Sequence, residues 1–207
     1  MIKRIIQTKF IAWMPLFLCI TLLSGCASLF YRQSQFNSNI SWNVREKQLK
    51  KIQQWHMEGV MGVQIPQKSF SAHFVWEQKN ASDYQINLFG PLGMDAVNMI
   101  GKKNKFTLHT SSGQVFTADN PEQLVLQQLG WRMPISDLYY WIRGLPADHF
   151  SVKNIHWDAF HHIQAFEQKN WHIHYLEYQV VNGVDLPKQM ILQRDRVTLR
   201  INIQKIN

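Results

Sequence analysis

The chain has 207 residues, with 22 basic and 14 acidic side chains, a formal net charge of +8 and two cysteines. No stretch combines a dense basic run with interleaved aromatic residues, which argues against nucleic acid as a partner. The length is sufficient for one domain with a sizeable core.

The N-terminus carries the pattern of a bacterial lipoprotein signal. Three basic residues precede a mostly apolar stretch at residues 10–23. This stretch is too short to span a bilayer as a helix, since that takes roughly 20 residues. It ends in the lipobox Leu-Ser-Gly-Cys at residues 23–26, so we expect cleavage before Cys26 and acylation of the Cys26 thiol.

This signal divides the chain into a cleaved peptide at residues 1–25, a lipidated N-terminus and polar tether at 26–40, and a folded domain at 41–207. The two or three acyl chains of a bacterial lipoprotein hold it on a membrane essentially permanently. In similar lipoproteins, aspartate directly after the cysteine favours retention at the inner membrane. Ala27 stands there instead, so we expect an anchor in the periplasm-facing leaflet of the outer membrane. The other cysteine leaves with the signal, so the domain folds without disulfides.

The charge of the mature chain allows two interpretations. The signal holds three of the 22 basic residues and no acidic one, which leaves 19 basic and 14 acidic residues and a net charge of +5. A positive surface favours contact with anionic phospholipid head groups. More often a positive net charge only keeps a protein soluble, and both interpretations stay open.

The first half of the domain begins with a helix and continues as strands. Apolar residues at helical spacing from Trp42 to Ile52 predict an amphipathic helix that starts at Ser41 and ends before Gly59. After Gly59 the period changes to two, which indicates half-buried antiparallel strands joined as hairpins. The clearest strands are expected at residues 70–77, 84–88 and 106–109, with turns at 79–82, 90–93, 101–104 and 111–113.

The helical pattern then returns twice. Asn120 is a good N-cap, Pro121 follows it at the first helical position, and Gly130 ends this helix. A second helix is expected from about Ile135 to Arg143. Four strands follow, and the Asn-Gly pair at 182–183 predicts a hairpin turn between two of them. Their expected ranges are residues 163–167, 171–181, 190–193 and 197–203.

This order of elements predicts an α+β fold. One helix, five or six strands, two helices and four strands cannot form the crossovers of a parallel sheet. The helices must therefore pack on one face of an antiparallel sheet.

Short motifs follow one another from about Trp55 to Leu199 in an order typical of one family. The main ones are SAHFVW at residues 71–76, GPLG at 90–93, GWRMP at 130–134 and YWIRGLP at 140–146. This ordered set, together with the lipobox, resembles LolB, the outer-membrane lipoprotein receptor family of Gram-negative bacteria.

The resemblance implies an incomplete, unclosed antiparallel β-barrel with a helical lid over a hydrophobic cavity. It also implies a carrier without chemistry of its own, which accepts lipoproteins from the periplasmic carrier LolA and inserts them into the outer membrane. In the family, the loop that matches Pro91, Leu92 and Gly93 projects a leucine into solvent, and this leucine is implicated in releasing cargo into the membrane. Burying such a side chain is worth roughly 1.5 to 3 kcal/mol, enough to bias the loop into a bilayer transiently.

Strand and helix parity suggests which side chains line the implied cavity. They are Phe74, Trp76, Ile86, Leu88, Leu124, Leu138 and Trp141. Aromatic side chains on facing surfaces are more often ordinary core, so parity alone leaves both roles open. The expected partners are a LolA-like carrier, lipoprotein acyl chains and outer-membrane phospholipid, and we expect a monomer.

Two other functions stay open. The histidine pairs at 161–162 and 172/174 suggest a metal site, because alternate residues of a strand share a side. No carboxylate base is spaced to complete it, and no Gly-x-Ser-x-Gly, His-Glu-x-x-His or phosphate loop is present. We therefore expect neither an enzyme nor a metal or cofactor. A structural lipoprotein that scaffolds other envelope machinery would share the lipobox and strands but lack the cavity.

Overall fold

The computed structural model describes residue 36 and residues 40–90, 96–148 and 150–207. All of them belong to the second of two compact units, which begins at Phe36. Two predicted sites, Cys26 and the turn with Pro91, Leu92 and Gly93, lie outside the described residues.

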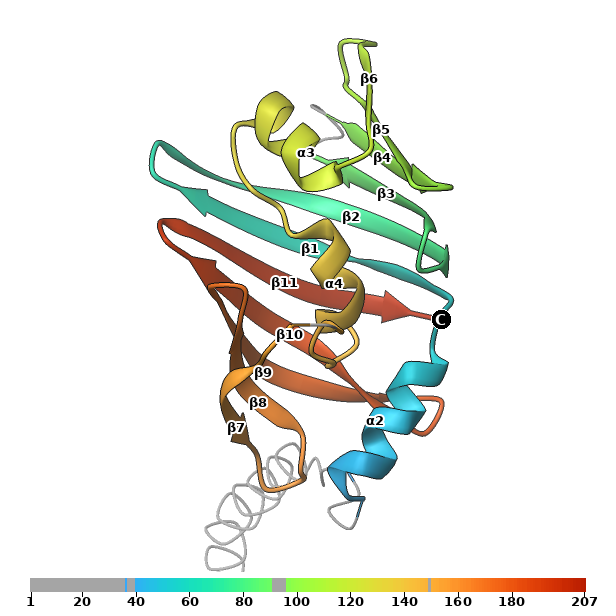
Figure 1. Cartoon of the computed structure of the whole chain (residues 1–207), viewed down its shortest axis with the longest axis vertical. Coiled ribbons are helices and arrows are strands. Elements are labelled where there is room, and N and C mark those ends of the chain that lie inside the picture. Colours follow the sequence, from blue (N-terminus) through green and yellow to red (C-terminus); the bar gives the residue numbers. More distant parts are fainter. Residues whose placement is uncertain (1–35, 37–39, 91–95, 149) are drawn as a thin grey trace, which may run out of the picture. The chain divides into compact units, whose positions relative to one another are not determined.

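One antiparallel sheet of eleven strands forms the framework of the domain (Figure 1). Along the sheet the order is β6-β5-β4-β3-β2-β1-β11-β10-β9-β8-β7, so the first and last strands of the chain pair in the middle. The edge strands β6 and β7 do not pair with each other, and the predicted unclosed antiparallel sheet is confirmed. The strands are β1 Trp55–Ile65, β2 Lys68–Asn80, β3 Asp83–Phe89, β4 Val97–Lys102, β5 Lys105–His109, β6 Val115–Ala118, β7 Lys153–Trp157, β8 Ile163–Gln168, β9 Trp171–Val181, β10 Val184–Arg194 and β11 Val197–Ile206.

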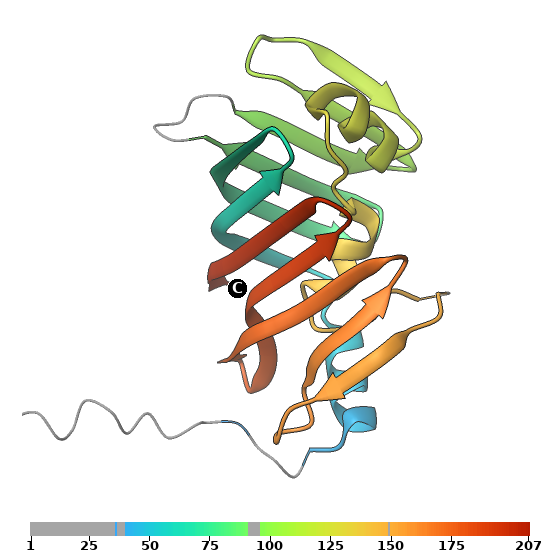
Figure 2. The ribbon, with the colours of Figure 1, turned by 90° about the vertical axis from the view of Figure 1, so that its left-hand side faces the viewer.

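The three helices of the described residues lie on one face of this sheet (Figures 1 and 2). They are α2 Trp42–Lys51, α3 Pro121–Leu129 and α4 Ile135–Trp141. The helices and the facing side chains of the sheet enclose the main apolar core.

Local signals predicted the ends of α3 well. The Asn120 side chain accepts a hydrogen bond from the Gln123 backbone N–H at 2.8 Å, and Gly130 ends the helix in the left-handed conformation with φ 78°. The predicted hairpin turn at Asn182 and Gly183 is also present, with φ of 50° and 77°. Type I′ turns require these positive φ values at both central residues, which asparagine and glycine tolerate.

The sequence prediction was wrong about where β1 begins. This strand starts at Trp55, four residues before Gly59, and α2 already ends at Lys51. Ile52 and Trp55 continue the helical spacing of α2, so the pattern could not separate the helix from the strand. Pairing with β11 shifts by one residue between Glu58 and Gly59, but burial along β1 alternates without a break across this position.

The prediction also missed one strand after helices α3 and α4. Five strands follow α4 instead of four, and the additional one is β7 at the edge of the sheet. All five of its residues are exposed, so it lacks the alternation of buried and exposed residues that identifies a strand. Helix α4 ends at Trp141, two residues earlier than expected.

Candidate functional site

Four of the seven predicted cavity residues form two directly opposed pairs on neighbouring strands. Phe74 on β2 lies opposite Leu88 on β3, and Trp76 lies opposite Ile86. Residues two apart in a strand point to the same face, so these four side chains form one apolar surface.

The other three residues cover this surface from the helices. Leu124 belongs to α3, and Leu138 and Trp141 belong to α4; all seven lie in one contiguous apolar cluster. Each is at most 7% exposed, so an acyl chain reaches them only if a helix moves. Their role in holding acyl chains stays a prediction.

Gly59 allows the sheet to bring Phe74 against the backbone of β1. A Cβ atom at this position would lie 2.8 Å from the Phe74 ring and 2.2 Å from the backbone oxygen of Asn202. Both separations are far below van der Waals contact. Close approach of the ring and of β11 therefore gives a physical reason for glycine at position 59.

Helix α4 is fastened to the sheet through the buried amide of Gln168 at the end of β8. This amide accepts hydrogen bonds from Trp141 Nε1 at 2.9 Å and from the Ala147 backbone N–H at 2.8 Å. It donates to the carbonyls of Ala147 at 2.9 Å and Phe150 at 3.0 Å. The Tyr175 hydroxyl donates to the Trp141 carbonyl at 2.7 Å, so the end of α4 is bonded to two strands.

An ion pair fastens the other end of α4. Lys169, in the turn between β8 and β9, lies 3.0 Å from the Asp137 carboxylate. Burial raises the pKa of Asp137, and the nearby ammonium group of Lys169 opposes this shift.

Arg143 joins the end of α4 to α2. This buried guanidinium donates to the carbonyl of Ile52, the C-cap of α2, at 2.6 Å, and its Cζ lies 4.1 Å from the centre of the Tyr139 ring. A cation is favourable at the negative end of a helix dipole and over an aromatic face. Burial lowers the pKa of Arg143. The ordinary pKa of arginine is so high, however, that the guanidinium stays charged at neutral pH.

Helix α3 is held differently. Its buried residues are Leu124 and Val125, and it contacts β5, β6 and α4. Within the described residues, one side-chain hydrogen bond joins it to another element, from the Ser136 backbone N–H to Glu122 at 2.9 Å, and this bond is exposed. Apolar packing therefore fixes α3, whereas buried polar contacts fix α4.

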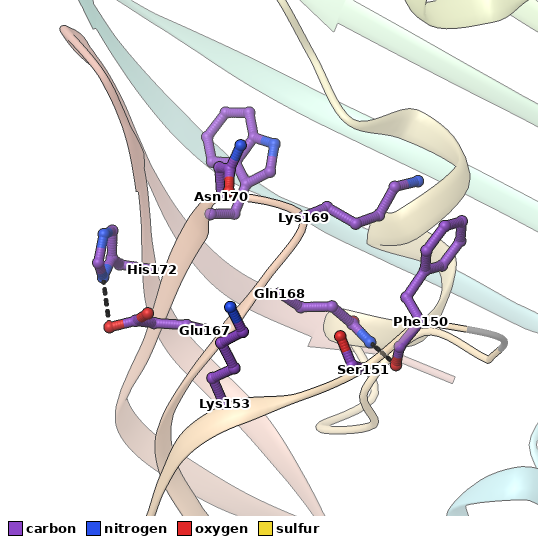
Figure 3. Close-up of a pocket in the computed structure, with 9 residues that line it drawn as sticks. Phe150, Ser151, Lys153, Glu167, Gln168, Lys169, Asn170 and His172 are labelled. Carbon is purple, nitrogen blue, oxygen red and sulfur yellow. Dashed lines mark hydrogen bonds and ion pairs between the residues drawn. The ribbon is translucent and has the colours of Figure 1, made fainter.

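A polar pocket of about 240 Å³ lies beside the contacts of Gln168 (Figure 3). Figure 3 shows the Gln168 amide bonded to the carbonyl of Phe150, and His172 paired with Glu167 at 3.2 Å. Two other hollows lie beside α3 and between β1, β2 and β11. None of these three is lined by any of the seven predicted cavity residues, so they are separate from the predicted acyl-chain site.

The candidate histidines differ in burial and in their contacts. His162 is buried between Asp158 and Asp185, with ring nitrogens 2.8 and 3.0 Å from their carboxylates. His172 and His174 are exposed on β9. In the part of the chain that the structure describes, no three His, Cys, Asp or Glu side chains are grouped so that they could hold a metal ion.

Comparison with known proteins identifies the family. The family model described as outer membrane lipoprotein LolB matches residues 53–205. The outer-membrane lipoprotein LolB of Coxiella burnetii is 36% identical over 185 residues, which cover 88% of this chain and 87% of that protein. The protein of the same name from Pseudomonas aeruginosa is 34% identical over 175 residues, 84% of each chain. The chain belongs to the LolB family.

Two solved structures share the fold. A LolA superfamily protein from Nitrosomonas europaea superposes with a TM-score of 0.52 at 6% identity, covering 81% of this chain and 93% of that chain. A DUF1329 family protein from Desulfovibrio piger also gives 0.52, at 9% identity, covering 79% and 89%. At such low identity the likeness concerns the fold alone.

Membership of the LolB family decides between the functions that the sequence left open. The chain is an outer-membrane lipoprotein, anchored on the periplasmic side, and not an enzyme. None of the helices that the structure describes is long and apolar enough to cross a membrane.

Proposed function

We propose that this chain receives lipoproteins from LolA and inserts them into the outer membrane, with the acyl chains sheltered between α3, α4 and the concave face of the sheet. The observation that carries this proposal is the contiguous apolar cluster under the helices of a LolB family member. The seven predicted residues in that cluster would contact the acyl chains.

Entry of an acyl chain requires one helix to move, and the contacts favour α3. Leaving the sheet would cost α4 its buried hydrogen bonds to Gln168 and Tyr175 and its part-buried ion pair with Lys169. Helix α3 would lose mainly apolar contacts, and an acyl chain can replace these. We therefore propose that α3 swings out with the following segment while α4 stays in place.

Release must be direct because free acyl chains are costly in water. A chain of ~16 carbons gains on the order of 12 kcal/mol on leaving water. Release of the acyl chain into the periplasm would therefore be very slow. The protein therefore takes its cargo directly from the cavity of LolA into its own cavity. From there it passes the cargo directly to the bilayer.

Two residues outside the described ranges complete the proposal. Cys26 would carry the lipid anchor, and Leu92, between Pro91 and Gly93, would dip into the bilayer while cargo leaves. Pro91 and Gly93 predict a tight turn, and a leucine in such a turn cannot easily fold back into the core. Its transfer energy is too small to hold the loop in the membrane permanently.

The test uses a lipoprotein loaded on LolA, the mature chain, and liposomes. We expect wild type to accept cargo and deliver it, and Leu92→Glu to accept cargo without delivering it. Leu176→Glu is the matched control, because Leu176 is 60% exposed in β9 and has no proposed role in transfer. Normal delivery by Leu92→Glu would remove Leu92 from the mechanism, and failure of wild type to accept cargo would refute the proposed function.

A further inference from the structure

Phe36, the first described residue, lies at the turn between β7 and β8. Phe36, where the second compact unit begins, packs against Phe160 and His162 of that turn, with ring centres 5.4 and 5.1 Å apart. The first turn of α2 lies beside it, since the Trp42 and Trp157 rings are 5.1 Å apart. Figures 1 and 2 both show the start of α2 next to the end of β7.

Large apolar side chains are exposed at this same end of the domain. Val44 in α2 is 50% exposed, and Ile155 and Trp157 in β7 are 40% and 42% exposed. Tryptophan is enriched at membrane–water interfaces, because one end of its side chain is apolar and the other bears a hydrogen-bond donor.

An unpaired lysine accompanies these apolar residues. Lys47 follows Val44 by three positions and therefore lies on the same side of α2. The acidic groups nearby are already engaged: Glu46 pairs with Lys50, and Asp185 pairs with Arg45. Within the described ranges, no carboxylate lies within ion-pair distance of Lys47.

We propose that Val44, Lys47, Ile155 and Trp157, which we call the entry surface, rest on the outer membrane, with Trp157 at head-group level and Lys47 against anionic phospholipid phosphates. This inference rests on the proposed anchor at Cys26. It is independent of the transfer loop with Leu92 and of the acyl-chain site under the helices.

The short tether makes the bilayer the partner that this surface meets. The ten residues 27–36 lead from Cys26 to the first described position, Phe36. They reach at most about 35 Å when fully extended, and about 17 Å on average as a flexible coil. A surface linked so closely to its target experiences an effective concentration on the order of millimolar, so a weak contact is sufficient.

Contact with the bilayer would have two consequences. It would cover β7, an edge strand whose free backbone groups otherwise invite pairing with another chain. It would also fix the orientation of the domain on the membrane, so that incoming carriers meet one constant face.

The test measures how deeply one side chain lies in the membrane. A spin label is attached to Val44→Cys in the mature lipidated chain, where acylation of Cys26 leaves the new cysteine as the free thiol. The chain is anchored in vesicles of phosphatidylethanolamine and phosphatidylglycerol. We expect collisions with a water-soluble nickel complex to fall at least threefold at this position.

Val115→Cys is the matched control, because Val115 is 57% exposed but lies in β6, at the opposite edge of the sheet. Its label should stay as accessible as in free protein. Equal accessibility of the two labels would overturn the inference. Protection of Val44→Cys that appears only at high protein density would also overturn it, because a second copy would then cover the surface.

A charge variant tests whether Lys47 contacts the membrane. A transfer assay separates this inference from the proposed function. Lys47→Glu should reduce the protection of the label at position 44 at least twofold, whereas Lys79→Glu, at an exposed position near the end of β2, should not change it. Failure of transfer with the label still protected would refute only the proposed function. Normal transfer with an unprotected label would refute only the entry surface.

Discussion

Replacing Gln168 by leucine tests whether buried polar contacts fix α4. The Gln168 side chain is 2% exposed and makes four hydrogen bonds with groups of Trp141, Ala147 and Phe150. Leucine has a similar volume but bonds to none of them. The substitution therefore leaves the packing nearly intact and removes the polar contacts.

The expected loss of stability follows from the groups left unpaired. Phe150 is exposed, so its carbonyl can be rehydrated. The Trp141 indole N–H and the backbone N–H and C=O of Ala147 remain buried without partners. At about 1 kcal/mol each, the low end of the range for a buried unpaired group, Gln168→Leu should cost about 3 kcal/mol.

Urea unfolding of the chain with Cys26→Ala measures this loss. With a slope of about 2 kcal/mol per molar urea, the midpoint should fall by about 1.5 M. Gln164→Leu is the control, since Gln164 is exposed on the same strand, and its midpoint should shift by less than about 0.3 M. A shift as small as this for Gln168→Leu would refute the view that these bonds hold α4 on the sheet.

Three further predictions concern other contacts of the site. Gly59→Ala should destabilise the domain by more than about 2 kcal/mol in urea unfolding, because its Cβ would overlap Asn202 and Phe74. Gly62→Ala is the control, since no atom lies nearer than 3.8 Å to its Cβ, and it should change stability by less than about 1 kcal/mol. Similar values for both variants would contradict the close approach at Gly59. The raised pKa of Asp137 means that the folded state takes up its proton first as pH falls, so wild type should gain stability relative to Asp137→Asn as pH falls from that raised pKa to the ordinary value of 3.8; a constant difference across this range would show that the carboxyl is not perturbed. Arg143→Met should speed hydrogen exchange in the last turn of α2 at least tenfold by removing its cap, and unchanged exchange there would show that Arg143 does not secure α2.

The sequence predicted those parts of the fold that depend on near neighbours. Asn120 and Gly130 predicted both ends of α3 because caps act within one turn of a helix. The strands next to the predicted cavity were equally clear, because one side of each is buried. β7 was missed because an edge strand exposed on both faces carries no period.

The polar contacts that fix α4 could not be predicted from the sequence. Gln168 precedes the positive-φ residues Lys169 and Asn170, so it looks like part of a polar turn. Its amide is buried only because Trp141 and Ala147, more than 20 residues away, fold over it. Arg143 lies in the family motif at 140–146, but its partner on α2 is set by tertiary packing alone.

Photo-cross-linking tests the acyl-chain site most directly. A lipoprotein whose acyl chain ends in a diazirine is transferred from LolA to the mature chain, irradiated, and mapped by mass spectrometry. We predict adducts on the facing surfaces of β2, β3 and α4, at Trp76, Ile86 and Trp141. Adducts confined to exposed positions such as Leu176 on β9, or none after transfer, would contradict an acyl-chain site under the helices.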